Sequence, residues 1–257
     1  MKVYELVGLE EVDGDIGVEI EVEGTNLPTK LLKWNSEYDG SLRGESREYV
    51  LKKPMSILEV KRALDGLHKT YNKCGSVVFD SARTGVHVHL NVQQLDFTQL
   101  FTLICVYLIV EEPLTGFCGA NRQGNHFCLR AKDADWQVRR LAEAATSGDL
   151  YFLDTGLLRY GALNPTSLFK FGSLEFRAMH CGRDLNPVYK WVRLLHTMKR
   201  NSLKFNNPID VVSKASELGS QGFLDFVFGR YAGHLTGDIG GGVRQAQDVA
   251  FARREWL

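Results

Sequence analysis

Three segments of this chain alternate apolar and polar residues with a period of two, and they constrain the fold more than any other feature. They are GVEIEVE at 17–23, VHVHLNV at 86–92 and SLEFR at 173–177. A period of two is the pattern of a β-strand whose faces meet different surroundings. The sequence therefore predicts a sheet with one apolar face, covered by helices, and one polar face.

The polar face of these strands carries an unusual set of side chains. They are Glu19, Glu21 and Glu23 from the first strand, His87, His89 and Asn91 from the second, and Glu175 and Arg177 from the third. A solvated strand face would instead carry a mixture of Lys, Thr, Ser and Gln. Adjacent carboxylates repel one another unless a cation compensates them. Each pattern alone is compatible with a solvated surface, but the three together favour a functional site.

The chemistry of this set indicates metal ions and phosphates. Carboxylates with an imidazole suit Mg²⁺ or Mn²⁺, whereas zinc normally takes more His or Cys ligands. Hard cations beside an arginine hold phosphates and neutralise charge in phosphoryl transfer. The residues alone therefore point to metal–nucleotide chemistry on the open face of an antiparallel or mixed sheet.

Other candidate residues lie between these strands, and each has an ordinary alternative. Glu48 lies in a predicted strand at 47–51 and becomes a metal ligand if that strand borders the first. Asp39 precedes a glycine, and Asp-Gly is a turn signal by itself. Arg122 either binds a phosphate or is solvated, and Asn164, before a proline, either faces the site or makes a turn.

The remaining elements follow from the spacing of apolar residues and from capping signals. Strands are also predicted near 30–35, 76–80 and 160–164. Helices are predicted at 57–74 after a capping box, after Asp96 in a buried stretch, at 133–147 and at 186–203, with helical segments beyond Pro208. The GDIGGG segment at 237–242 lacks the Lys-Ser/Thr of a phosphate loop, so a flexible turn is expected there.

Composition limits the class of protein and its partners. The residues are 44% apolar and 24% charged, which is typical of a globular protein, and the length of 257 residues indicates one large domain or one and a half. Thirty-one basic residues balance 31 acidic ones, so neither nucleic acid nor an anionic membrane is expected as the main partner. The longest strongly apolar run, Leu103 to Val110, is too short to span a bilayer.

The N-terminus and the cysteines predict a cytoplasmic location. Acidic residues occupy the N-terminal stretch where a signal peptide would be apolar. The five cysteines are odd in number and include no CxxC, which favours free thiols in a reducing compartment.

The order of the motifs resembles the amidoligase family, which is grouped with the carboxylate–amine ligases related to glutamine synthetase and glutamate–cysteine ligase. The resemblance covers about residues 15 to 200. It rests on seven segments: Gly17-Val-Glu-Ile-Glu, Asp39-Gly-Ser, Glu48-Tyr-Val, Gly85-Val-His-Val-His-Leu, Arg122 with Asn125 and Phe127-Cys128, Arg159-Tyr-Gly-Ala-Leu-Asn164, and Leu174-Glu-Phe-Arg177. This family is bacterial and phage-encoded, so the cytoplasm would be that of the host for a phage protein. The resemblance implies a catalytic domain at 1–200, and residues 201–257 are expected to form a helical extension packed on it.

The resemblance also implies a fold and a reaction. The fold is a glutamine-synthetase-like curved, mainly antiparallel sheet with helices on one face and the active site on the other. The reaction uses ATP and Mg²⁺ or Mn²⁺ to join a small-molecule or peptide carboxylate to an amine through an acyl phosphate. A guanidino phosphotransferase and a non-catalytic phage structural protein are the alternatives, and a homo-oligomer is left open.

The same resemblance assigns roles to the candidate residues. One metal is expected on Glu19, Glu175 and one of His87 and His89, and the other on Glu21 and Glu48, with Glu23 or Asp39 as a further ligand or as the acceptor of the amine proton. Arg177 is expected at the transferring phosphoryl group, with Arg122 as a further catalytic candidate. His89, Asn91, Asn164 and Arg122 are the expected nucleotide contacts.

Overall fold

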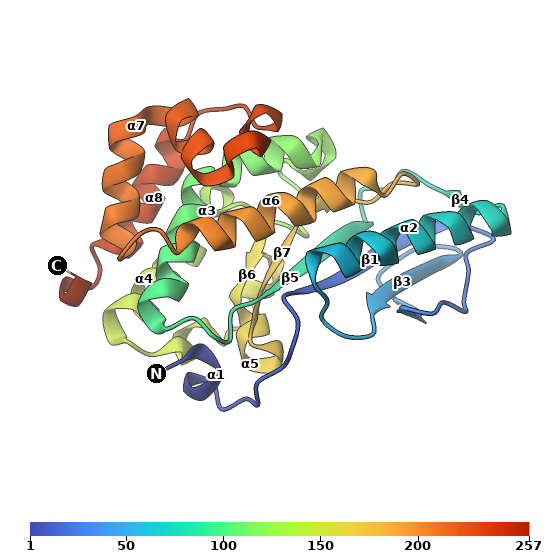
Figure 1. Ribbon diagram of the computed structural model, residues 1–257, viewed down its shortest axis with the longest axis horizontal. Coiled ribbons are helices and arrows are strands. Elements are labelled where there is room, and N and C mark those ends of the chain that lie inside the picture. The colour runs from blue at the N-terminus through green and yellow to red at the C-terminus, as the bar shows by residue number, and fades with distance from the viewer. Residues whose placement is uncertain (257) are drawn as a thin grey trace.

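The computed structural model describes residues 1–256 and shows an α+β fold built on one mainly antiparallel, open sheet (Figure 1). The strands lie in the order β2-β3-β1-β5-β7-β6, and β4 pairs with the end of β1. Their bounds are β1 (Ile16–Thr25), β2 (Trp34–Glu37), β3 (Ser46–Leu51), β4 (Val77–Val78), β5 (Gly85–Asn91), β6 (Leu163–Asn164) and β7 (Ser173–His180). Each named pair of strands is antiparallel.

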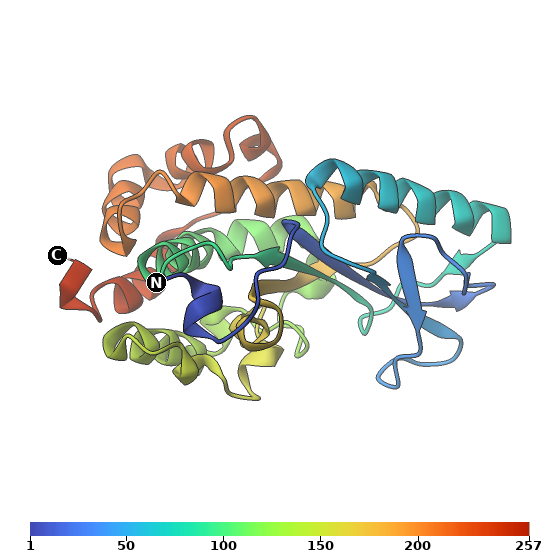
Figure 2. The same cartoon turned by 60° about the horizontal axis from the view of Figure 1, so that its bottom comes forward.

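The predicted division of the sheet into an apolar and a polar face is confirmed. Val18, Ile20 and Val22 of β1 are at most 1% exposed, as are Val88 of β5 and Phe176 of β7. Helices α2 and α6 run along this apolar face (Figure 2), and α3 and α6 contact β7. The opposite face is therefore left to the charged side chains.

Helices α2 and α3 begin where the capping signals predict, whereas the helix expected from 133 begins at Asp135 and Asn186, the expected N-cap, is the first residue of α6. Ser56 bonds reciprocally with Glu59 at the start of α2, and Asp96 with Gln99 at the start of α3. The helices are α1 (Val3–Leu6), α2 (Ile57–Cys74), α3 (Phe97–Cys118), α4 (Asp135–Ser147), α5 (Leu168–Phe171), α6 (Asn186–Ser202), α7 (Pro208–Phe228) and α8 (Gly240–Ala250).

Helix α3 is the buried helix that the sequence predicts. It is long and apolar enough to cross a membrane by length and composition, but 83% of its most apolar window is buried inside the fold. It packs against α6, α7 and α8 and against β7. Its apolar composition is therefore explained by its place at the centre of the molecule.

The C-terminal helices share this core. Helices α7 and α8 both pack on α3, and α8 also packs on α4. The turn expected at 237–242 is shorter than predicted, because residues 237–239 are non-helical but α8 begins at Gly240. A Cβ at Gly242 would lie 2.2 Å from the Leu108 carbonyl oxygen, so this glycine lets α8 approach α3 closely.

Three predicted strands differ from those in the structure. The strand expected at 30–35 lies at Trp34–Glu37, because Trp34 is buried whereas Leu32 is 89% exposed and has no core to join. The strand expected at 160–164 is reduced to Leu163–Asn164, because the preceding residues Leu158–Tyr160 form a 3-10 turn, and the strand expected at 76–80 is reduced to Val77–Val78. All five cysteines are free, as expected.

A carboxyl group buried in α3 gives the fold a pH dependence. Glu111 is 4% exposed, and burial raises its pKa from 4.5 to about 7 despite a 2.8 Å hydrogen bond from the Ala131 amide. The unfolded chain releases this proton at lower pH than the folded protein does. Stability is therefore lost as pH rises from about 4.5 to about 7, by up to roughly 3 kcal/mol.

Glu111→Gln is expected to remove this loss. The variant should match the wild type near pH 4.5 and exceed it in unfolding free energy by about 1–3 kcal/mol at pH 8, because the amide oxygen keeps the bond to Ala131. Urea denaturation at the two pH values measures the difference. Glu143→Gln, at a surface ion pair with Arg140, is the control and should change neither value by more than about 0.5 kcal/mol. An unchanged pH slope in Glu111→Gln would contradict the assignment.

Candidate functional site: a carboxylate–imidazole cluster

The strand register brings the charged side chains of four strands together on the polar face. Three pairs lie directly across from one another: Glu21 and Glu48 on β1 and β3, Glu19 and His87 on β1 and β5, and His89 and Glu175 on β5 and β7. Cross-strand neighbours on one face are close enough for direct interaction. The register between the strands therefore brings these residues side by side, and the alternation within each strand directs their side chains to the same face.

Glu19 lies at the centre of this cluster. Its Oε2 lies 3.2 Å from Nδ1 of His87, and its Oε1 lies 3.4 Å from Nε2 of His89. Burial alone would raise the pKa of Glu19, but hydrogen bonds with His87 and His89 outweigh it, and the pKa lies far below its usual range. Glu19 is therefore a carboxylate at neutral pH.

Two groups of side chains have the donor set and spacing of a cation site, and both include Glu19. In one group Glu19, His89 and Glu175 offer ligand atoms within 4.8 Å of one another, and in the other Glu19, Glu48 and His87 do so. The first group matches the ligand set expected for one metal, with His89 as its histidine. The second joins Glu48 to Glu19 and His87, whereas Glu21 lies beside it, 3.7 Å from Nε2 of His87.

The electrostatics of the cluster favour a bound cation. Burial, together with the neighbouring Glu19 and Glu21, raises the pKa of Glu48 to about 7. Burial also raises the pKa of Glu21. The buried Nε2 of His89 has no hydrogen bond of good geometry. A divalent cation would relieve the carboxylate repulsion and give this nitrogen a partner.

Glu175 is held from two sides. Its Oε1 accepts from Arg177 Nη1, and its Oε2 accepts a 2.5 Å bond from Asn164 Nδ2. The Oδ1 atom of Asn164 accepts from the amide and hydroxyl of Thr166. Asn164, expected to contact a nucleotide, is thus 4% exposed and bonded to Glu175, so it orients that carboxylate.

A β-bulge places Arg177. Between Val86 and Val88 the register of β5 against β7 shifts, so His87 alone faces Arg177 and Ala178. The guanidinium of Arg122 lies at this bulge. It donates hydrogen bonds to the carbonyls of Arg177 (2.9 Å), Ala178 (3.1 Å) and Thr84 (3.2 Å).

Arg122 therefore has a different place from the one expected. It is 2% exposed and its three bonds go to backbone, so the structure assigns it to positioning Arg177. Its guanidinium still borders the cluster. A Cβ at Gly85 would lie 3.1 Å from Arg122 Nη2 and 3.4 Å from Glu21 Oε2, which explains the glycine that opens β5.

The remaining expected site residues are spread more widely. Asp39 borders the cluster, and its Oδ1 accepts from the Ser41 amide. Glu23 is buried and accepts from the Arg43 amide, at the far end of β1. Asn91 donates to the carbonyls of Val12 and Gly14, so its amide fixes the N-terminal loop.

Two cavities open on either side of Glu19. The first, here called the arginine pocket, has a volume of about 430 Å³. Its lining is Glu19, Glu21, Asp39, Ser41, Glu48, Arg83, His87, Arg122, Phe127, Arg159, Tyr160 and Arg177. Carboxylates and guanidinium groups therefore share one cavity, as metal-bound polyanions require.

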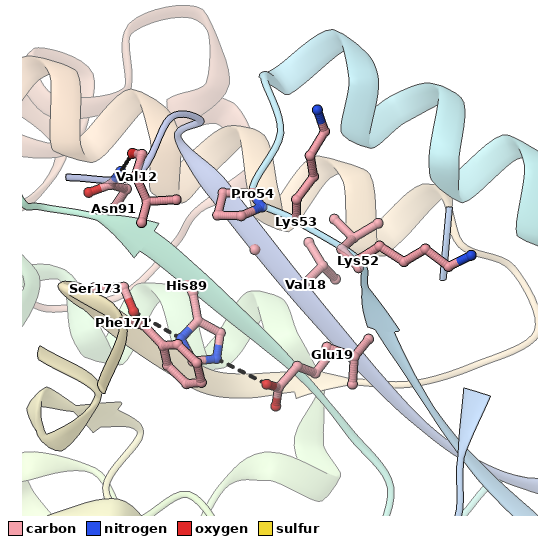
Figure 3. Close-up of a pocket in the computed structure, with 13 residues that line it drawn as sticks. Val12, Val18, Glu19, Lys52, Lys53, Pro54, His89, Asn91, Phe171 and Ser173 are labelled. Carbon is pink, nitrogen blue, oxygen red and sulfur yellow. Dashed lines mark hydrogen bonds and ion pairs between the residues drawn. The ribbon is translucent and has the colours of Figure 1, made fainter. Parts of the chain in front are cut away.

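The second cavity, here called the apolar slot, has a volume of about 210 Å³, and Glu19 and His89 are among the residues that line it (Figure 3). Its lining is Val12, Gly17, Val18, Glu19, Val50, Leu51, Lys52, Lys53, Pro54, His89, Asn91, Phe171 and Ser173. Ser173 Oγ lies 3.0 Å from Nδ1 of His89 and orients this ring.

Sequence reasoning missed several of these lining residues. Arg83 and Ser41 lie in loops with no periodicity, joined by a 3.0 Å bond from Arg83 to the Ser41 carbonyl. Ser173 had a usable signal, because it lies two residues before Glu175 and so shares its face. Val50 likewise shares the face of Glu48 on β3.

No protein-family model matches the chain, and no curated protein sequence matches it. The resemblance to amidoligases therefore rests on the sequence motifs alone.

Proposed function

We propose that this protein is an ATP- and Mg²⁺-dependent ligase that joins a carboxylate to an amine through an acyl phosphate, with a glutamine-synthetase-like active-site sheet. The observation that carries the proposal is that two cation groups share Glu19, and that Glu19 lines one cavity together with Arg83, Arg159 and Arg177. Mn²⁺ suits the same ligands.

The acidic, basic and aromatic residues of the site have separate roles in this reaction. Glu19, Glu48 and His87, and Glu19, His89 and Glu175, would hold two divalent cations, which neutralise charge on the triphosphate. Arg177 lies within the same cavity and offers donors to the γ-phosphoryl group. Phe127 and Tyr160, 42% and 37% exposed, offer aromatic surfaces to a nucleobase.

The chemistry balances in two steps. A carboxylate oxygen attacks the γ-phosphorus of ATP, the bond to the bridging oxygen breaks, and ADP leaves. The amine nitrogen then attacks the acyl carbon, the carbon–oxygen bond to phosphate breaks, and phosphate leaves. Asp39 lines the cavity and is the candidate to accept the amine proton, whereas Glu23 is buried beside Arg43.

The site fits small-molecule or peptide substrates in the cytoplasm, where ATP and Mg²⁺ are supplied. The guanidino phosphotransferase and the non-catalytic phage protein have no observation of their own in their favour. The charged cluster argues against a scaffold, because adjacent carboxylates that raise one another's pKa destabilise the free protein.

Hydroxylamine tests the proposal, because it replaces an amine and traps an acyl phosphate as a hydroxamate. With ATP, Mg²⁺ and a mixed pool of carboxylic acids, we expect hydroxamate, ADP and phosphate in equal amounts, all abolished by EDTA. AMP and pyrophosphate would indicate an adenylating enzyme. No nucleotide turnover with any acid pool would favour a non-catalytic protein.

A further inference from the structure

We propose that the apolar slot binds the non-reacting, apolar part of the acid substrate, so that the enzyme selects acids with an aromatic or aliphatic tail. This rests on the proposed function, because the polar head of that substrate would lie at Glu19 and His89. The shared residue Glu19 joins the slot directly to the arginine pocket.

Gly17 forms part of the slot wall, beside the ring of His89. It lies on the polar face of β1, directly across from His89 on β5. A Cβ there would be 3.3 Å from Cβ of His89, a tight contact, so the glycine lets the His89 side chain lie close against β1. Val50 borders the slot on the β3 side, and Phe171 borders it with its ring nearly perpendicular to that of His89, at 5.5 Å between centroids.

The polar groups around the slot are turned away or already bonded. Asn91 donates to backbone carbonyls, and Lys52 Nζ donates to the Leu31 carbonyl at 3.2 Å. The ammonium groups of Lys52 and Lys53 both point away from His89 and Glu19 (Figure 3). The lysines therefore line the slot with their aliphatic stems, and the walls offer a ligand mainly apolar contact.

Two residues of the slot lining differ from the rest. Glu19 and His89, whose Nε2 lies 3.4 Å from Glu19 Oε1, belong to one of the two cation groups. A ligand that fills the slot would thus place one end against apolar walls and the other at a cation. A carboxylate with an apolar tail has this division of polarity.

The nucleotide is the competing occupant, and the distribution of charge disfavours it. Three arginines that would hold phosphates, Arg83, Arg159 and Arg177, line the arginine pocket and are absent from the slot lining. The aromatic residues Phe127 and Tyr160 lie in the same pocket as these arginines. The nucleobase and the triphosphate are therefore both accommodated there, and the slot remains for the acid.

Calorimetric titration with 3-phenylpropionate and acetate, in the presence of Mg²⁺ and a non-hydrolysable ATP analogue, tests the inference. We expect 3-phenylpropionate to bind at least about tenfold more tightly than acetate. Phe171→Ala should reduce this ratio several-fold, and Val50→Phe, which fills the slot, should abolish it. Phe152→Ala removes an aromatic of similar exposure outside the slot and should leave the ratio unchanged.

Binding of Mn²⁺ and of the ATP analogue is measured on the same variants. Both should be unchanged in Phe171→Ala. Loss of Mn²⁺ binding would mean that Phe171 acts by positioning His89, and loss of nucleotide binding would place the base in the slot; either overturns the inference. Equal affinity for the two acids overturns it as well.

Different results would rule out the slot as the acid-binding site and rule out the ligase reaction. Slot-dependent binding of 3-phenylpropionate without any binding of Mg²⁺ and the ATP analogue would remove the ligase and leave the slot as an acid-binding site. Hydroxamate formation that does not discriminate between acids with and without apolar tails would leave the ligase and remove the slot.

Discussion

Glu19→Gln is expected to abolish Mn²⁺ binding at both cation groups, with a loss of affinity of at least about 100-fold at each. Glu19 is the only residue that the two groups share, and it contacts both histidines. A neutral amide supplies one weaker oxygen and removes the charge that both cations need. Titration of Mn²⁺ followed by electron paramagnetic resonance, with the ATP analogue present, measures the number of bound ions and their affinities.

Two further variants separate the shared role from a general loss of charge. Glu48→Gln should weaken the group that contains His87, and Glu175→Gln the group that contains His89, each leaving one ion bound. Glu23→Gln, on the same face of β1 but bonded to the Arg43 amide, should retain both. Retention of two ions in Glu19→Gln would contradict the bridging assignment, whatever the activity of that variant.

The faces of the sheet were predictable because they depend on one strand at a time. Val18 and Glu19 are sorted to opposite faces by the period of two, and burial of Val18 follows from the helices that cover its face. Capping signals at Ser56 and Asp96 are equally local, and both helices begin there. These features need no knowledge of what lies beside each strand.

The ligand groups were only partly predictable, because they depend on register between strands. The pairing of Glu19 with His87 and of His89 with Glu175 is fixed by hydrogen bonding of β1 to β5 and of β5 to β7. A shift of two residues would preserve every face and give different groups. The resemblance placed Glu48 with Glu21, which the register sets directly across from it, and the structure also groups Glu48 with Glu19 and His87.

The position of Arg122 was harder to predict from the sequence. It depends on a β-bulge of β7 that frees the carbonyls of Arg177 and Ala178, and no periodicity marks this bulge. The apolar slot was missed for a related reason, because segments far apart in the chain, at Gly17, Val50 and Phe171, line it.

Arg177→Lys is expected to lower the rate of ADP formation by about 10³-fold, with the affinity for ATP changed by less than about tenfold. The guanidinium bonds Glu175, lies 3.4 Å from Nδ1 of His87 and reaches the Phe127 carbonyl at 3.5 Å, so it is oriented from three sides. Lysine keeps the positive charge that compensates the neighbouring carboxylates. It presents a point charge, however, where the transferring phosphoryl group needs the planar donor fork of a guanidinium.

Single-turnover measurements of ADP release, beside equilibrium binding of the ATP analogue, separate the chemical step from nucleotide affinity. Arg83→Lys, at the rim of the same pocket, is the matched control and should lose less than about tenfold, because its guanidinium is bonded to the Ser41 carbonyl. A Lys variant at position 177 with the full rate would remove the assignment of Arg177 to the γ-phosphoryl group, and with it the phosphoryl-transfer step on which the ligase reaction depends.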